Sequence, residues 1–182
     1  MRLIGISGSL RKGSYNRALL EAAVAERPPD VEVERLDGLE LVPAYDEDLD
    51  GSPTPVAVAE LRRTLASADA VLIATPEYNA SIPGALKNAL DWASRPFPDN
   101  CLRGKPVAVI GASTGLFGAV WAQAELRKVL KTIGAAVLDA ELPVPTAHSA
   151  FCKGGGLCHP ELAATLRSIV HRLVGQTLVQ AA

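Results

Sequence analysis

The chain has 182 residues, of which 48% are hydrophobic, and this suits a single domain, residues 1–182, with a substantial core. Its formal net charge of −2 gives no indication of a nucleic-acid or anionic-membrane partner. No apolar run reaches the length of a membrane span or a secretion signal, so we expect a cytoplasmic protein. Three cysteines, an odd number, do not indicate a disulfide framework.

Hydrophobic patterning predicts strands and helices that alternate along the chain. The strand candidates are residues 3–6, 31–36, 70–74, 106–110 and 135–138. A helix with apolar residues at helical spacing follows each strand; the fourth is stopped by Gly134, and the last begins at Pro160. Residues 37–55 are expected to form a surface loop, and residues 143–160 irregular structure. Arg62 lies off the apolar face of the second helix, and we expect it to be solvated.

Five strands alternating with five helices imply an α/β fold, a doubly wound parallel sheet with helices on both faces. In the strand order 2-1-3-4-5, the first, third and fourth strands are neighbours. Their polar loops, residues 8–16, 75–81 and 111–118, would then meet at one crevice beyond the carboxyl ends of the strands. This convergence predicts one mononucleotide, with its phosphate at the first loop and its ring between the other two.

The first loop, Gly8 to Asn16, combines glycines, hydroxyls and one arginine directly before a helix. Glycines let backbone N–H groups converge, and a helix N-terminus is positive, so the loop suits an anion. Side chains that can donate to a phosphate are Ser9, Arg11, Ser14 and Asn16. The two glycines have the spacing of a Walker A loop, but Ser14 and Tyr15 stand where its lysine and hydroxyl should be. A single terminal phosphate is therefore favoured over a triphosphate.

Three segments resemble the NADPH-dependent FMN reductases, which are flavodoxin-like proteins that include quinone, chromate and azo-dye reductases. They are residues 8–17 (GSLRKGSYNR), residues 75–96 (TPEYNASIPGALKNALDWASRP) and residues 113–130. The resemblance implies bound FMN, NADPH or NADH as co-substrate, a small-molecule electron acceptor, and a homodimer or homotetramer. The expected cofactor-binding residues are Ser9, Arg11, Ser14, Tyr15, Asn16, Pro76, Glu77, Tyr78, Asn79, Ser113, Thr114 and Gly115.

Catalysis by such an enzyme needs no acid–base or nucleophile constellation from the protein, because the flavin itself carries the electrons. We therefore expect ping-pong hydride transfer of two electrons to quinones, azo compounds, flavins or metal oxyanions. Many family members have an aromatic residue where this chain has Ala80, and an arginine where it has Trp121. Losing that positive charge and gaining apolar surface predicts a preference for flat, uncharged acceptors such as quinones over chromate.

Two other functions compete with this interpretation. Residues 111–115 read G-x-S-x-G after a strand, which is the nucleophile elbow of α/β-hydrolases, and Asp139 and then His148 or His159 follow in the expected order. A serine hydrolase that uses Ser113 would leave the phosphate loop unexplained. A flavodoxin-type electron carrier would bind the same cofactor, but such carriers are usually strongly acidic and this chain is not.

The segment before the last helix holds four residues of the types that bind zinc. They are His148, Cys152, Cys158 and His159. Their spacing fits no common zinc template, and the glycines at 154–156 favour flexibility. We expect a mobile loop near the cofactor rather than a metal site.

Overall fold

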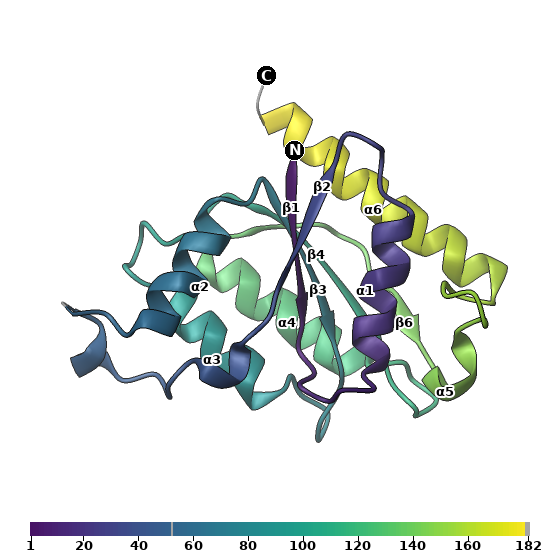
Figure 1. The fold of residues 1–182 in the computed structure, drawn as a ribbon, viewed down its shortest axis with the longest axis horizontal. Helices are drawn as coiled ribbons and strands as arrows, with labels where there is room; N and C mark the ends of the chain where they lie inside the picture. Colours follow the sequence, from purple (N-terminus) through teal and green to yellow (C-terminus); the bar gives the residue numbers. More distant parts are fainter. Residues whose placement is uncertain (52, 181–182) are drawn as a thin grey trace.

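The computed structural model describes residues 1–51 and 53–180, and the side chains up to residue 177. One parallel sheet runs through this part of the chain, in the order β2-β1-β3-β4-β5, with β6 paired to the far end of β4 (Figure 1). The strands are β1 (Arg2–Ser7), β2 (Glu32–Leu36), β3 (Ala70–Thr75), β4 (Pro106–Ala112), β5 (Ala136–Val137) and β6 (Pro143–Val144). The predicted strand order and the doubly wound, flavodoxin-like fold are confirmed.

Helices cover both faces of the sheet, as expected for parallel strands joined by right-handed crossovers (Figure 1). The helices are α1 (Tyr15–Ala25), α2 (Val56–Ala66), α3 (Gly84–Ala93), α4 (Val120–Ile133), α5 (Ala147–Ala150) and α6 (Pro160–Gln180). Buried residues of α2, α3 and α4 form one core layer, and those of α1 and α6 form the other. As predicted, Gly134 ends α4 in a left-handed conformation and Pro160 begins α6.

The apolar run in β3 supplies both core layers at once. Val71 and Ile73 pack against the α2–α4 layer, whereas Leu72 packs against the α1 and α6 layer. Successive side chains of a strand point to opposite faces of the sheet. When helices cover both faces, every side chain of the strand is buried, and apolar residues are favoured at every position. This explains why β3 is continuous in hydrophobicity and entirely buried.

Strand β6 and helix α5 lie inside the stretch that we expected to be irregular, and that expectation is wrong for residues 143–144 and 147–150. The Gly111 N–H donates to the Leu142 carbonyl at 3.1 Å, and the Ser113 N–H donates to the Val144 carbonyl at 3.0 Å. A strand of two residues that starts with proline has neither the length nor the alternation that identifies strands in sequence. Its effect is to extend the sheet beside the third polar loop.

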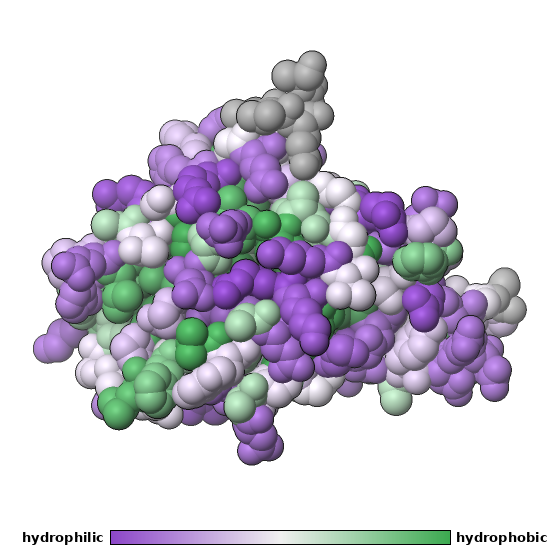
Figure 2. Space-filling model, turned by 180° about the vertical axis from the view of Figure 1, so that it is seen from behind, coloured by the Kyte–Doolittle hydropathy of each residue, from purple (hydrophilic) through white to green (hydrophobic). Residues whose placement is uncertain are grey.

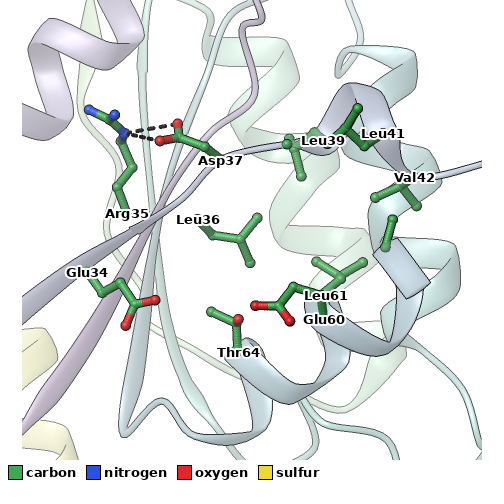
Figure 3. Close-up of a pocket in the computed structure, with 12 residues that line it drawn as sticks. Glu34, Arg35, Leu36, Asp37, Leu39, Leu41, Val42, Glu60, Leu61 and Thr64 are labelled. Atoms are coloured by element: carbon green, nitrogen blue, oxygen red, sulfur yellow. Dashed lines mark hydrogen bonds and ion pairs between the residues drawn. The ribbon is translucent and has the colours of Figure 1, made fainter. Parts of the chain in front are cut away.

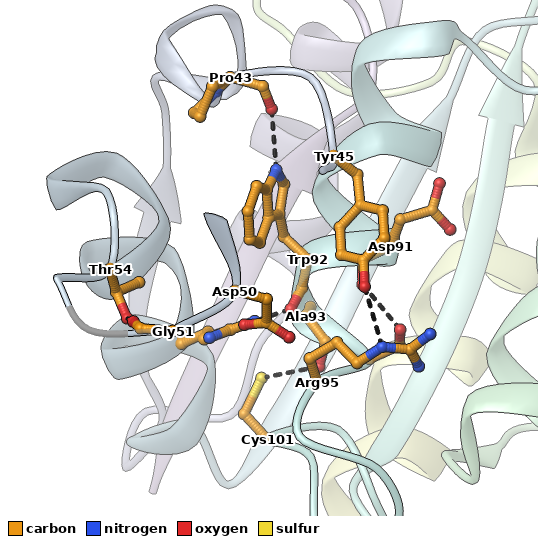
Figure 4. Close-up of polar contacts among 12 residues, drawn as sticks. Pro43, Tyr45, Asp50, Gly51, Thr54, Asp91, Trp92, Ala93, Arg95 and Cys101 are labelled. Atoms are coloured by element: carbon orange, nitrogen blue, oxygen red, sulfur yellow. Dashed lines mark hydrogen bonds and ion pairs between the residues drawn. The ribbon is translucent and has the colours of Figure 1, made fainter. Parts of the chain in front are cut away.

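Residues 37–51 and 53–55 lie mostly at the surface, as expected, but part of this stretch is anchored on α3 (Figure 4). They include two 3-10 helices, η1 (Leu39–Leu41) and η2 (Glu47–Leu49). The fully buried Trp92 donates from Nε1 to the Pro43 carbonyl at 2.8 Å, and the Tyr45 ring meets its indole edge-on at 4.9 Å. An aromatic residue with a polar edge thus fixes a loop whose own sequence has little hydrophobic content.

The expectation that Arg62 is solvated is also wrong. Its side chain is only 19% exposed, and the guanidinium pairs with Asp50 at 2.7 Å and donates from Nε to the Trp92 carbonyl at 3.0 Å. Arg62 therefore joins α2 to the anchored loop and to the end of α3. The sequence pattern placed it outside the apolar face of α2 but could not show that a loop lies over that position.

A disulfide joins Cys152 to Cys158, contrary to our reading of the odd cysteine count, while Cys101 is free. The odd count is explained because two cysteines pair locally and leave one unpaired thiol. Within the described residues, no cluster of three or more His, Cys, Asp or Glu side chains is arranged to hold a metal. Among the helices of this part of the chain, none combines the length and the hydropathy needed to cross a bilayer.

Candidate functional site

Three loops meet around a cleft of about 250 Å³ at the carboxyl ends of β1, β3 and β4. Its lining consists of Ser9, Arg11, Ser14, Tyr15, Asn16, Pro76, Glu77, Tyr78, Ala112, Ser113 and Thr114. Most residues that we expected at the site therefore share one cavity, and Asn79 and Gly115 lie just outside its lining. Ala112 was not expected there, because the last residue of an apolar strand carries no polar signal.

Gly8 lets the first loop approach the second. Its N–H donates to the Ala74 carbonyl at 2.8 Å, which continues the pairing of β1 with β3. A Cβ at this position would lie 3.0 Å from Leu86 Cδ2 and 3.3 Å from Pro76 Cδ. Any larger residue would push the two loops apart, so the glycine sets the width of the cleft.

Ser14 caps α1 at the floor of the cleft. Its buried side chain accepts a hydrogen bond from the Arg17 N–H at 3.2 Å. That bond uses only a lone pair of the hydroxyl, so its proton remains available to an anion. The positive end of α1 lies at the same place, and hydroxyl and helix end together favour a bound phosphate.

Asn16 joins the first loop to the third. Its Nδ2 donates to the Ala112 carbonyl and its Oδ1 accepts from the Ala112 N–H, both at 2.9 Å. The side chain is buried, and both of its polar atoms have partners within the protein. We expected Asn16 to donate to a phosphate; its observed contacts fix the distance between two walls of the cleft.

Arg11 supplies an exposed positive charge at the rim. Its guanidinium lies 5.1 Å from the centre of the Tyr15 ring, and Tyr15 in turn stacks on Phe151 at 6.3 Å. None of the ion pairs formed among the described residues involves Arg11. The cation is thus positioned by aromatic packing and is open to an incoming anion.

The second loop is a tight turn with two residues in the left-handed region. Tyr78 and Ser81 exchange backbone hydrogen bonds of 3.0 and 3.1 Å around Asn79 (φ 54°) and Ala80 (φ 59°). Positive φ at both central residues is typical of a type I′ turn. The turn leaves the Tyr78 side chain 51% exposed beside the cleft.

Glu77 connects the second loop to α4. Its Oε2 accepts from the backbone N–H groups of Trp121 and Ala122, each at 3.0 Å. The residue at the N-cap position of α4 is Ala119, which has no side chain able to cap the helix. Glu77 takes over that task from another loop. One of its two carboxylate oxygens, Oε2, is thereby occupied within the protein.

The third loop is held by backbone pairing with the region of β6. The Ser113 hydroxyl accepts from the Gly115 N–H at 3.1 Å. In the described part of the chain, the Ser113 side chain makes no hydrogen bond to a histidine, and the Asp139 contact found is its carbonyl accepting from Arg172. The serine–histidine–aspartate relay of a hydrolase is therefore not assembled, and the structure does not support that alternative.

Large apolar side chains are exposed where the third loop, which lines the cleft, leads into α4, and this surface is named the entrance. Leu116, Phe117 and Trp121 are all exposed, and the rings of Phe117 and Trp121 meet edge-on at 4.9 Å. The reverse face of the molecule mixes hydrophilic surface with areas where hydrophobic residues gather (Figure 2). The entrance thus offers flat, uncharged surface next to a polar anion site.

A second hollow of about 240 Å³ lies between β2 and α2 (Figure 3). Three carboxylates, Glu34, Asp37 and Glu60, line it, and its single cation, Arg35, donates to Asp37 at 2.8 Å. Such surroundings repel a phosphate. The cleft between the three loops is the better candidate for an anionic cofactor.

Comparison with known proteins decides between the remaining functions. The family model described as NADPH-dependent FMN reductase matches residues 1–149. The chain belongs to this family. An NAD(P)H-dependent FMN reductase of Pseudomonas aeruginosa is 45% identical over 158 residues, which cover 86% of this chain and 84% of that protein. A quinone reductase of Escherichia coli K12 is 39% identical over 140 residues, covering 76% and 74% of the two chains.

The NADPH-dependent FMN reductase fold is also seen in a solved relative. The flavoenzyme NAD(P)H:(acceptor) oxidoreductase FerB from Paracoccus denitrificans superposes with a TM-score of 0.85 at 35% identity, covering 97% of this chain and 96% of that one. The expectations of an enzyme of this family, of FMN and of NAD(P)H are confirmed. The chain is therefore an enzyme of this family rather than a flavodoxin-type electron carrier.

Proposed function

We propose that this reductase holds FMN in the cleft between the three loops and uses it to reduce quinones with NAD(P)H. The observation that carries the proposal is the meeting of an anion site and two ring-sized walls in one cavity. The phosphate would bind Ser9, Arg11, Ser14 and the N-terminus of α1, with Tyr15 and Asn16 fixing the shape of that loop. The ring would lie against residues 76–79 and 113–115.

The residues present fit such a ligand. The buried Ser9 and Ser14 provide hydroxyl donors, and Arg11 has a guanidinium without an internal carboxylate partner among the described ion pairs. A phosphate monoester of charge near −2 would be matched by one arginine and one helix N-terminus. FMN, once bound, supplies the centre that accepts and returns a hydride.

The chain's own part in the reaction is to hold the flavin ring, to polarise it by hydrogen bonds and to shield part of it from solvent. Within residues 77–79 and 113–115, the N–H groups of Tyr78, Ser113 and Gly115 already have acceptors in the protein. The polar edge of a ring would therefore be met by the N–H groups of Glu77, Asn79 and Thr114. Tyr78 lines the cleft and is half exposed, so we propose that it shields part of a bound ring and leaves one face open. One open face does not accommodate a nicotinamide and an acceptor together, so we propose that they bind in turn, by a ping-pong scheme.

The acceptor proposed is a flat, uncharged quinone. Relatives from Escherichia coli and Pseudomonas putida bear the name quinone reductase, and one from a Burkholderia species is named 2-hydroxy-1,4-benzoquinone reductase. The exposed rings of Phe117 and Trp121 at the entrance favour stacking on such a molecule. Azo compounds and free flavins are also flat, whereas chromate is a small anion and would gain nothing from this surface.

Absorption spectroscopy of the purified protein tests the proposal directly. We expect the two-banded spectrum of an oxidised flavin, and mass spectrometry of the released cofactor should identify FMN. Steady-state rates with NADPH or NADH and a benzoquinone should give parallel double-reciprocal lines. Full quinone reduction by a flavin-free preparation would contradict the cofactor assignment, and intersecting lines would contradict the ping-pong order.

Assembly and location extend the proposal. We propose a homodimer or homotetramer in the cytoplasm, because exposed apolar side chains border the entrance and a second copy could bury them. Multi-angle light scattering of the holoenzyme measures the mass in solution. A monomer at micromolar concentration would contradict the assembly and leave the FMN site unaffected.

A further inference from the structure

The disulfide loop before α6 has no part in the function proposed above, yet it touches a wall of the cleft. Cys152 and Cys158 are both exposed and close a loop that contains three consecutive glycines, residues 154–156. Phe151, next to the first cysteine, stacks on Tyr15 at 6.3 Å. Tyr15 lines the cleft and lies beneath the Arg11 guanidinium. A chain of contacts therefore connects the disulfide to the phosphate-binding loop.

The two cysteines each lie beside a residue that anchors the loop. Leu157 is buried in the core layer of α1 and α6, and Phe151 packs against that same layer. These two residues also form an isolated antiparallel bridge. The disulfide therefore ties the half-exposed aromatic anchor to the buried aliphatic one, and it restrains the ring on which Tyr15 rests.

We propose that Cys152 and Cys158 form a reversible thiol–disulfide site, and that its redox state controls how firmly the phosphate loop holds FMN. The reagents that it takes are small thiols or the exposed dithiols of redox proteins. The inference rests on the proposed binding of the FMN phosphate beside Tyr15 and Arg11. In the oxidised form Phe151 is held against Tyr15; in the reduced form the loop keeps its backbone hydrogen bonds but loses its crosslink, and that support weakens.

The thiol–disulfide exchange balances in atoms and electrons without any contribution from the flavin. A thiolate RS⁻ attacks one sulfur of the disulfide, forms a mixed disulfide, and releases the other cysteine as a thiolate, which takes a proton. A second RS⁻ attacks the sulfur of R in the mixed disulfide, so RSSR leaves and the first cysteine is freed and protonated. Two electrons and two protons have passed from two RSH molecules to the protein. Oxidation by a disulfide RSSR reverses both steps.

Two features favour a reversible site over a purely structural crosslink. Both cysteines are exposed, so a thiol can reach either sulfur. Backbone hydrogen bonds from Cys152 N–H to the Gly156 carbonyl at 3.1 Å and from Cys158 N–H to the Ala150 carbonyl at 2.9 Å do not depend on the disulfide. They keep the two halves of the loop close after reduction, so the thiols can pair again.

The third cysteine provides an internal contrast. Cys101 is a lone, partly buried thiol whose Sγ lies 3.4 Å from the Ala93 carbonyl oxygen. Burial raises its pKa, so it reacts slowly with thiol reagents. A thiol-dependent change in FMN binding should therefore come from the exposed pair alone.

The experiment uses the holoenzyme with and without dithiothreitol. Alkylation with iodoacetamide followed by peptide mass spectrometry reports which cysteines become free, and flavin fluorescence after dilution reports the FMN dissociation constant. We expect reduction to label Cys152 and Cys158 and to raise the dissociation constant about two- to tenfold, the effect of losing one aromatic pair. Reoxidation with a small disulfide should restore the original value.

Variants separate the disulfide from the ring that it holds. The double variant Cys152→Ser, Cys158→Ser should show the weaker binding at all times and no response to dithiothreitol. Phe151→Ala should bind FMN weakly even with its disulfide intact. Cys101→Ser is the matched control and should respond as the parent does. Circular dichroism melts confirm that each variant is folded before FMN is titrated.

The outcomes keep this inference apart from the proposed function. If reduction labels both cysteines but leaves the dissociation constant unchanged, the inference is overturned while the FMN site stands. If dithiothreitol leaves both cysteines unlabelled in the native protein, the site is not reversible and the inference is again overturned. If the oxidised protein binds no FMN at all, the proposed function is contradicted, and the inference that rests on it is contradicted as well.

Discussion

The carboxylate of Glu77 accepts hydrogen bonds from the N–H of Trp121 and of its neighbour, each at 3.0 Å, across 44 residues of sequence. This contact joins the loop that would hold the flavin ring to the helix that carries the apolar entrance. Glu77→Ala should lower the free energy of unfolding by about 1–2 kcal/mol, the range for losing a helix cap. Glu77→Gln keeps an oxygen acceptor and should cost less. Urea unfolding measures the free energy of unfolding of both variants and should show the larger loss for Glu77→Ala. Equal stability of Glu77→Ala and the parent would contradict a capping role.

Arg11 should contribute to FMN affinity without contributing to the fold. Arg11→Ala removes the exposed guanidinium at the cleft and should weaken FMN binding by about 1.5–3 kcal/mol, the range for a hydrogen bond to a charged group. Lys12→Ala removes a neighbouring exposed charge that does not line the cleft, and it should have little effect. Fluorescence titration with FMN compares the two. Equal losses in both variants would point to general electrostatic attraction instead.

Asn16 offers a test of structural against ligand-binding roles. Asn16→Ala leaves the buried N–H and carbonyl of Ala112 without their partner, at a cost of about 2–4 kcal/mol in the free energy of unfolding. The variant should lose FMN affinity only because the cleft walls are no longer fixed. Urea unfolding of the flavin-free protein measures the first effect. If the flavin-free variant is as stable as the parent and binds FMN poorly, Asn16 acts mainly on the phosphate.

Ala80 carries backbone strain that glycine would remove. An alanine with φ of 59° costs roughly 1 kcal/mol relative to glycine in the same turn, so Ala80→Gly should raise Tm by about 2–4 °C. Ala59 is exposed inside α2, and Ala59→Gly should lower Tm by a similar amount. Differential scanning calorimetry measures both. A lower Tm for Ala80→Gly would show that the turn does not adopt this conformation in solution.

Trp121 should set the acceptor preference. Trp121→Arg restores the arginine that many family members have there, and its backbone N–H still reaches Glu77. The ratio of kcat/KM for chromate to that for a benzoquinone should rise about tenfold, which corresponds to ~1.4 kcal/mol of electrostatic attraction. Trp121→Phe keeps an aromatic surface and is the matched control. An unchanged ratio in Trp121→Arg would exclude this position from acceptor recognition.

Much of the fold was predictable because its signals are local. A few neighbouring residues are enough to identify the apolar strands, Gly134 at the end of α4 and Pro160 at the start of α6. The predicted sheet order then places the three loops together at the carboxyl ends of β1, β3 and β4. The features that the sequence pattern did not predict depend on partners elsewhere in the chain. They are the two residues of β6, the loop that covers Arg62, and the pairing of Cys152 with Cys158.

The same distinction applies within the candidate site. Ser14 was expected to donate to the phosphate, and the structure shows that its hydroxyl also caps α1. Glu77 and Asn16 were both expected to bind the cofactor, but their side chains have observed partners elsewhere in the protein, Glu77 at the start of α4 and Asn16 at the end of β4. A polar residue in a ligand-binding motif looks the same in sequence whether it serves the ligand or the scaffold.

The bond pair between Asn16 and Ala112 spans 96 residues of sequence, so the phosphate loop is completed only after β4 has joined the sheet. During synthesis the first loop and α1 emerge early, but a chain that ends before β4 lacks the wall that fixes them. Flavin uptake should therefore require β4, although β5 and β6 follow β4 in the chain. Nascent chains arrested before residue 106 should capture no FMN, and the appearance of bound flavin can be used to time the addition of β4 to the sheet.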